Sequence, residues 1–226
     1  LPCYSAEQNQ GAEIALAGRL QELSALDSSS LSETNRHTYT LLLRYFQNSL
    51  EGCIYTYYDE PLSPSSGMQS QLPILLAEYT FRTRQDVEDY LALLDQVDDY
   101  FASLIVYEQE KKEAGLLQSD TSLQKVMDQC TTILSKNELK EGTHFLQSTF
   151  TERLSGLISS GFLNAEEAMY YESVNQRLLN TVVQPAYDRL GDDIFLLMED
   201  GSSTPYGLTS LPKGKEYYGY LVRMTT

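Results

Sequence analysis

The sequence predicts an all-α fold in which long antiparallel helices form a bundle or a bent helical array. Apolar residues recur at steps of three and four along several long segments, which is the helical period. Short polar links rich in Ser, Gly and Pro separate these segments, and no useful stretch alternates as a strand would. Hydrophobic residues make up 42% of the 226 residues, enough for a core. We therefore expect one helical domain over residues 1–226.

The first part of the chain predicts two long helices followed by an irregular loop. The helices cover about residues 6–26 and 31–58, and the second has an apolar stripe that we expect to face inward. Residues 59–67 cannot be regular, because two prolines remove backbone donors and a glycine permits a left-handed turn. The next segment, 68–79, is apolar but contains Pro73, so it is a short helix or a buried loop.

The rest of the chain predicts further helices. They cover about residues 84–114, 121–135, 142–159 and 164–199, and a last one begins near Lys215. Pro185 is expected to kink its helix, because proline lacks the N–H that this position would donate. Helix starts are marked by four N-terminal capping pairs: Ser5 with Gln8, Ser30 with Glu33, Thr83 with Asp86, and Asn164 with Glu167, of which Ser5 lies outside the residues described below.

The charge balance narrows the classes of partner. The chain has 16 basic and 32 acidic residues, a formal net charge of −16. Binding of nucleic acid or of an anionic membrane needs clustered Lys and Arg, so we expect neither partner. No stretch reaches the roughly 20 apolar residues of a transmembrane helix, and no signal peptide is evident at the start. Leu1 and Pro2 before Cys3 are a poor match to a lipid-anchor motif.

Complete catalytic and metal-binding motifs are missing from the sequence. HExxH, GxSxG, P-loop and GxGxxG patterns do not occur. The two histidines, His37 and His144, have no carboxylate at a metal-binding helical spacing, so we expect surface or capping roles for them. Cys53 and Cys130 fall on apolar stripes and are expected to be buried hydrophobes. We therefore predict no catalytic residue, no metal ligand and no cofactor in this chain.

Two carboxylates and the tyrosines leave alternatives open. Asp98 and Glu108 continue an apolar stripe, so each lies at its edge, forms a structural salt bridge or acts as a functional acid. Tyrosines gather just before the Pro-Ser loop and again in the last helix. Because tyrosine buries a ring while presenting a hydroxyl, these clusters either fill the core or line a binding surface.

Several segments together resemble one protein family. They are the run YDEPLSPSSGMQSQLP at 58–73 with its continuation to residue 83, and the stretches 86–91, 110–116, 183–187 and 211–218. In this order they are similar to the bacterial "domain of unknown function 885" family. The resemblance implies a mostly helical protein of about twice this length or more, often exported or lipid-anchored, and grouped with zinc-dependent metallopeptidases. The zinc motif of that family lies in its second half, beyond Thr226.

The resemblance gives this chain the role of a non-catalytic N-terminal portion that forms one wall of a peptide-binding groove. Its implied partners are the C-terminal remainder of the same polypeptide and a peptide substrate, with zinc only in the full-length parent. The candidate substrate-binding residues lie in the Pro-Ser-Gly loop and at the start of the last helix: Ser65, Ser66, Gly67, Gln69, Gln71, Tyr217 and Tyr218. The alternative is a free-standing helical module that binds a peptide or protein without metal.

Overall fold

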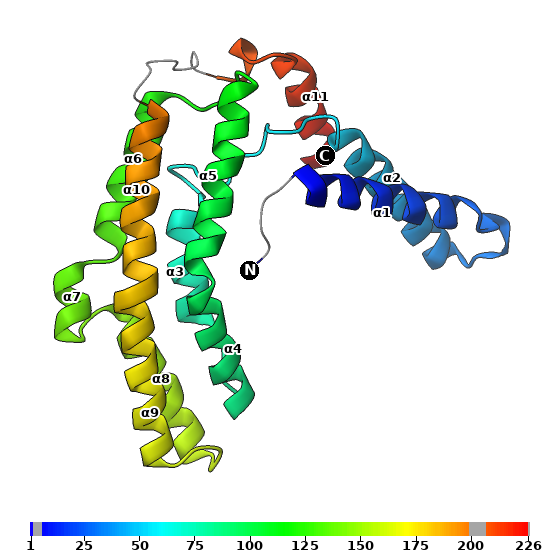
Figure 1. Ribbon diagram of the computed structural model, residues 1–226. Helices are drawn as coiled ribbons and strands as arrows, with labels where there is room; N and C mark the ends of the chain where they lie inside the picture. The colour runs from blue at the N-terminus through cyan, green and yellow to red at the C-terminus, as the bar shows by residue number, and fades with distance from the viewer. Residues whose placement is uncertain (2–5, 199–206, 226) are drawn as a thin grey trace.

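The computed structural model describes residues 1, 6–198 and 207–225, and every regular element in these ranges is helical. This confirms the predicted all-α class. The larger part is a bundle of roughly aligned helices (Figure 1), namely α3 (Met68–Glu78), α4 (Arg84–Asp95), α5 (Val97–Glu113), α6 (Asp120–Ile133), α7 (Lys136–Glu141), α8 (Phe145–Ser159), α9 (Ala165–Leu178) and α10 (Gln184–Met198). No described helix is long and apolar enough to cross a membrane.

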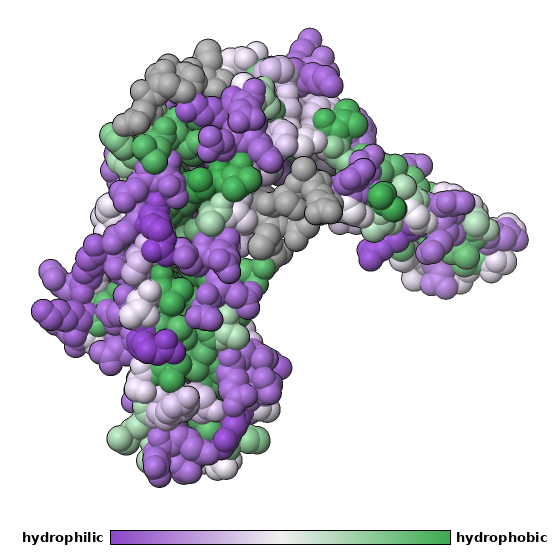
Figure 2. All heavy atoms as spheres, in the orientation of Figure 1, coloured by the Kyte–Doolittle hydropathy of each residue, from purple (hydrophilic) through white to green (hydrophobic). Residues whose placement is uncertain are grey.

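The bundle has one continuous hydrophobic core. Leu94 and Leu104 from α4 and α5, Leu123 from α6 and Phe150 from α8 are fully buried in it. α10 packs against both α5 and α6. Figure 2 shows hydrophilic side chains over much of the visible bundle face, with apolar atoms in the furrow between α10 and its neighbours. This core fixes the bundle from which the candidate site is built.

Two helices project away from the bundle as an antiparallel hairpin, here called the arm (Figure 1). The arm consists of α1 (Ala6–Ser24) and α2 (Glu33–Gly52), joined through the 3₁₀ turn Ser28–Ser30. The sequence predicted that the apolar stripe of α2 faces inward, yet α2 has no fully buried residue, and Leu42 is 39% exposed. That expectation is wrong because the arm is only two helices thick. The last helix, α11 (Gly214–Thr225), packs against α2 at the base of the arm.

Several helix boundaries differ from the prediction. The helix expected over 84–114 is interrupted at Gln96, whose N–H bonds to Leu93 O at 3.2 Å and so tightens the turn. The helix expected to reach Tyr58 ends at Gly52. Residues 136–141 form α7, which was not predicted, and Gly142 ends it in a left-handed conformation with φ 75°.

Pro185 lies near the start of α10, and the preceding segment Leu179–Val183 forms a π-helical turn instead of a simple proline kink. The N–H of Gln184 bonds to Leu179 O, five residues back. This wider turn shifts the hydrogen-bond pattern just before the residue that has no N–H to donate. The helical rod therefore continues to Met198.

Local capping explains where several helices begin. Thr83 with Asp86 and Asn164 with Glu167 form reciprocal capping boxes, as predicted. The predicted pairing of Ser30 with Glu33 is wrong, since the Ser32 side chain accepts from the Asn35 N–H and α2 begins two residues later than expected.

Candidate functional site

A cluster of four tyrosines joins the base of the arm to α11. In this tyrosine cluster, Tyr55, Tyr58 and Tyr217 are each 8% exposed, and Tyr220 packs beside them. The ring centroids of Tyr58 and Tyr217 are 4.6 Å apart, and those of Tyr55 and Tyr220 are 5.3 Å apart. Such aromatic pairs contribute stability beyond the area that they bury. The cluster therefore fixes α11 against the segment that follows α2.

Two glycines lie where the chain is closely packed around the rings. A Cβ on Gly52 would lie 2.2 Å from the Tyr220 hydroxyl oxygen, so a larger residue there would displace the Tyr220 ring. A Cβ on Gly214 would lie 1.5 Å from Leu208 O, which demands glycine where α11 begins. Tyr57 adopts a left-handed φ of 69°, an uncommon conformation for a bulky residue, and its ring packs against that of Tyr107 on α5. The chain thus turns sharply before it enters the bundle.

A hollow of about 600 Å³, here called the tyrosine hollow, lies between the arm, α5 and α11. Its lining includes Tyr55, Tyr57, Tyr107, Tyr217 and Tyr220. Among its described lining residues, the charged ones are both acidic: Glu13 from α1 and Asp59 from the segment after the arm. Burial, followed by the negative charge of Asp59, raises the pKa of Tyr217 to about 12 and also raises the pKa of Tyr220. The hydroxyls of these two tyrosines are therefore protonated and can donate hydrogen bonds.

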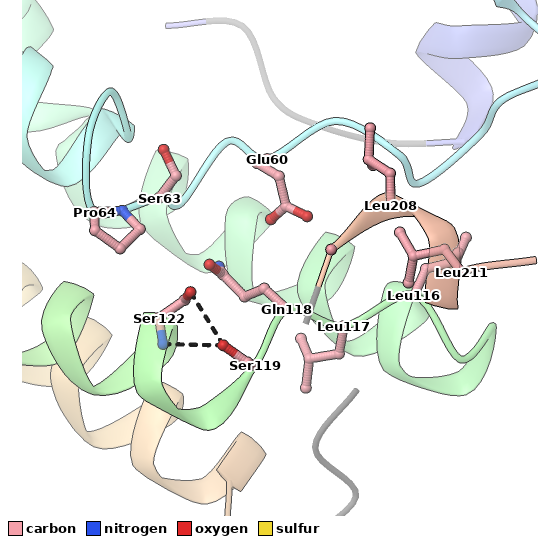
Figure 3. A pocket seen from close by; sticks show the side chains of 11 residues that line it. Glu60, Ser63, Pro64, Leu116, Leu117, Gln118, Ser119, Ser122, Leu208 and Leu211 are labelled. Atoms are coloured by element: carbon pink, nitrogen blue, oxygen red, sulfur yellow. Dashed lines mark hydrogen bonds between the residues drawn. The ribbon is translucent and has the colours of Figure 1, made fainter. Parts of the chain in front are cut away.

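A smaller hollow of about 330 Å³, here called the leucine hollow, is lined by the continuation of the segment after the arm, through Glu60, Ser63 and Pro64. Its apolar walls come from Leu116, Leu117, Leu208 and Leu211. Figure 3 shows the Glu60 carboxylate pointing into the space between these leucines and Gln118. Of the Asp59-Glu60 pair, Asp59 thus lines the tyrosine hollow and Glu60 the leucine hollow.

A buried lysine holds this pair in place. The Lys111 ammonium is fully buried on α5, donates to Asp59 O at 2.8 Å and lies 2.9 Å from Glu60 Oε2. Its third neighbour is Glu108 Oε2 at 3.5 Å, and neither carboxylate oxygen of Glu108 accepts a hydrogen bond within the described ranges. Burial raises the pKa of Glu108 to about 7, although Lys111 acts in the opposite direction. The buried ammonium of Lys111 therefore ties Asp59 and the more exposed Glu60, which lie in the segment between the hollows, to the bundle.

The comparison with protein families decides the assignment. The profile described as "Bacterial protein of unknown function (DUF885)" matches residues 1–226. The chain belongs to this family. Among curated proteins, no match was found.

A solved structure shares the fold of this family member. It is the crystal structure of a "putative lipoprotein" from Colwellia psychrerythraea, with a TM-score of 0.78 at 18% sequence identity. The similarity covers 99% of this chain and 38% of that one, so the family member spans well under half of its structural neighbour.

The predicted loop residues lie outside both hollows. Ser65 and Ser66 are exposed and Gln71 is half-buried, whereas Gly67 and Gln69 are buried. Gln69 Nε2 donates to Ser63 O and to Gln129 Oε1, each at 2.7 Å, so this side chain braces the loop against α6. The loop reaches the leucine hollow through other residues, Ser63 and Pro64.

The two predicted tyrosines of α11 separate. Tyr217 lines the tyrosine hollow, whereas Tyr218 is 61% exposed and lines neither hollow. The predicted site residues did not include Asp59, Tyr107 or Tyr220, which line the tyrosine hollow. Tyr220 belongs to the second tyrosine cluster of the sequence and Asp59 directly follows the first, whereas nothing in the sequence pointed to Tyr107.

Asp98 and His144, two of the candidate residues from the sequence, form structural contacts. Asp98 is half-exposed and pairs with Arg189, with the Nε–Oδ1 distance at 2.9 Å. His144 caps α8: its Nδ1 accepts from Leu146 N–H and its Nε2 lies 2.9 Å from Ile133 O, which places the proton on Nε2. His37 is exposed on α2. Capping by His144 and surface exposure of His37 match the prediction.

The two described cysteines differ in burial, and neither belongs to a metal-binding cluster of the described residues. Cys130 is buried as predicted, but Cys53 is only half-buried and lines the tyrosine hollow. Within residues 1, 6–198 and 207–225, no group of three or more His, Cys, Asp or Glu side chains could hold a metal ion. The described residues therefore do not fit a zinc site, and no step of chemistry through zinc is assigned to them.

Proposed function

We propose that this chain is a non-catalytic helical portion of a longer, zinc-dependent bacterial peptidase, and that the tyrosine hollow forms one wall of its peptide-binding groove. The observation that carries the proposal is the hollow itself. Its volume of about 600 Å³ falls within the range of ligand sites, roughly 300–1,000 Å³. Protonated tyrosine hydroxyls at its edge can donate to the carbonyl groups of a peptide.

Two comparisons support the longer parent protein. The resemblance of the sequence motifs implies a zinc site in the second half of the family pattern, and the structural neighbour has more than twice the matched length. Zinc and the reacting groups would then come from the remainder of the polypeptide, which would pack against this portion as its partner.

We also propose that the parent protein is extracytoplasmic and lipid-anchored. The support is the description of the structural neighbour as a lipoprotein, together with the family resemblance. Fractionation of cells expressing the full-length protein tests this: lipid-anchored protein partitions into the detergent phase of a phase-separating detergent. Recovery of all of it in the aqueous phase of a cytosolic extract contradicts the proposal.

Peptide hydrolysis by the full-length protein tests the proposed function. A quenched-fluorescent peptide library should be cleaved with zinc present, spared after chelation and cleaved again when zinc returns. Tyr220→Phe should raise KM several-fold with little change in kcat, because a ground-state contact is lost. Tyr170→Phe is the control, since Tyr170 is 64% exposed on α9 and lines neither hollow.

The same assay distinguishes the alternative of a free-standing binding module. Peptide binding that persists without metal, in a protein that never cleaves the library, would favour the module and refute the peptidase. An unchanged KM in Tyr220→Phe would remove the hollow from the groove.

A further inference from the structure

We infer that the tyrosine hollow receives a positively charged side chain, a lysine or an arginine of a bound peptide. The inference rests on the proposed function and specifies the class of peptide that the groove takes. The charges of the hollow favour a cation. Glu13 and Asp59 line the tyrosine hollow, whereas none of its described lining residues is Lys, Arg or His.

Both carboxylates are available to a ligand. No described residue forms a hydrogen bond or ion pair with the side chain of Asp59 or of Glu13. The nearby cations are engaged elsewhere: Lys111 bonds to the Asp59 carbonyl oxygen and to Glu60, and Arg223 of α11 pairs with Glu51. A cationic ligand group would therefore meet uncompensated negative charge in a partly enclosed space, where Coulomb attraction exceeds its value in open water.

The aromatic rings favour the same class of ligand. The rings of Tyr217 and Tyr220 are nearly parallel, with 25° between their planes and 6.1 Å between their centroids, and Tyr55 packs against both. Tyr57 and Tyr107 form a second aromatic pair in the lining. The negative faces of such rings attract ammonium and guanidinium groups, and the rings also cover the apolar stem of a long side chain.

Other ligand classes fit the hollow less well. A neutral apolar side chain would displace water from two carboxylates without replacing its hydrogen bonds, which is unfavourable. An acidic side chain would be repelled by both carboxylates. The described lining lacks the cluster of three ligating side chains that a metal ion needs. The formal net charge of −16 would also draw basic peptides toward the protein.

Matched peptides test the inference on the full-length protein. Acetylated pentapeptide amides carry Lys, norleucine, Arg, citrulline or Glu at the central position between alanines. Their affinities are measured by titration calorimetry with metal chelated, so that cleavage does not interfere. Norleucine and citrulline keep the size of Lys and Arg but remove the charge. We expect the Lys and Arg peptides to bind about tenfold more tightly than their neutral counterparts.

Variants locate the effect in the hollow. Asp59→Asn retains the carbonyl that Lys111 holds and should reduce the preference for charge, and adding Glu13→Gln should abolish it. Glu152→Gln removes the same charge from an exposed position on α8 and should leave the preference unchanged. Equal binding of charged and neutral peptides, absence of binding by every peptide, or a preference that survives the double variant would overturn the inference.

Failure of the inference and failure of the proposed function are separable. A preference for Lys and Arg in a protein that never cleaves peptides supports the inference and refutes the zinc peptidase. Zinc-dependent cleavage without any preference for a cationic side chain supports the zinc peptidase and refutes the inference.

Discussion

Replacement of Glu108 by glutamine should change how the stability of the protein depends on pH. The Glu108 side chain is fully buried on α5, and its only described charged contact is Lys111 at 3.5 Å. Burial raises its pKa from the ordinary 4.5 to about 7. The folded protein therefore binds this proton more tightly than the unfolded chain does.

The direction and size of the effect follow from this difference. Stability that comes from the Glu108 proton is fully present below about pH 4.5 and is lost as the pH rises to about 7. At about 1.4 kcal/mol per pKa unit, the total loss is about 3 kcal/mol. Glutamine has the same shape and does not titrate in this range. Glu108→Gln should thus match the wild type near pH 4.5 and exceed its stability by up to about 3 kcal/mol at pH 8.

Urea unfolding followed by circular dichroism at a series of pH values measures this difference. The quantity of interest is the stability of the variant minus that of the wild type, because all other titrating groups cancel in it. Glu152→Gln, an exposed position, should give a flat difference. A flat difference for Glu108→Gln as well, or one that falls as the pH rises, would refute the reasoning from burial.

Three further changes test the packing that builds the candidate site. Gly52→Ala should lower the stability by about 1–3 kcal/mol, because the added methyl group overpacks against Tyr220. Gly18→Ala is the control: it lies in open space on α1 and should stabilise the protein through its higher helix propensity. Thermal melts of both variants check this. Lys111→Met should lower the free energy of unfolding by about 3–5 kcal/mol at pH 8, because it leaves two carboxylates without their cation. The loss should be smaller at pH 5, where these carboxylates take up protons more readily. Urea unfolding measures both values, and equal losses at the two pH values would contradict the charge argument. Iodoacetamide should modify Cys53 slowly, because burial raises its thiol pKa, and Cys130 only after unfolding, because its pKa is about 12; peptide mapping by mass spectrometry would expose the reverse order.

Helical periodicity predicted the bundle but could not predict the arm. The period shows that a helix has an apolar face and leaves open what covers that face. In the bundle, Leu94, Leu104 and Leu123 meet other helices and are fully buried. In the arm, Leu42 follows the same spacing and stays exposed, as does Ile54 just after the end of α2. The break at Gln96 was hidden for a similar reason, since the apolar stripe continues through it.

The candidate site was visible in the sequence only in pieces. The tyrosine clusters at 55–58 and 217–220 are evident, but the sequence around each cluster does not indicate that the two lie in contact. Gly52 leaves room for the Tyr220 ring, and Gly214 lets α11 begin close to the Leu208 carbonyl. The burial of Lys111 was also beyond prediction, because its sequence neighbours Glu110, Lys112 and Glu113 are charged, whereas the tertiary fold buries this lysine beside Glu108 and within 2.9 Å of Glu60.

Photo-crosslinking of a bound peptide tests most directly whether the tyrosine hollow is the peptide-binding wall. A lysine-containing pentapeptide with a benzophenone group is irradiated with the full-length protein, and the linked residues are identified by mass spectrometry. We predict crosslinks to residues that line the hollow, among them Cys53, Thr56, Leu221 and Met224. Crosslinks confined to the Pro-Ser-Gly loop at 65–67, or to the bundle face, would contradict the account.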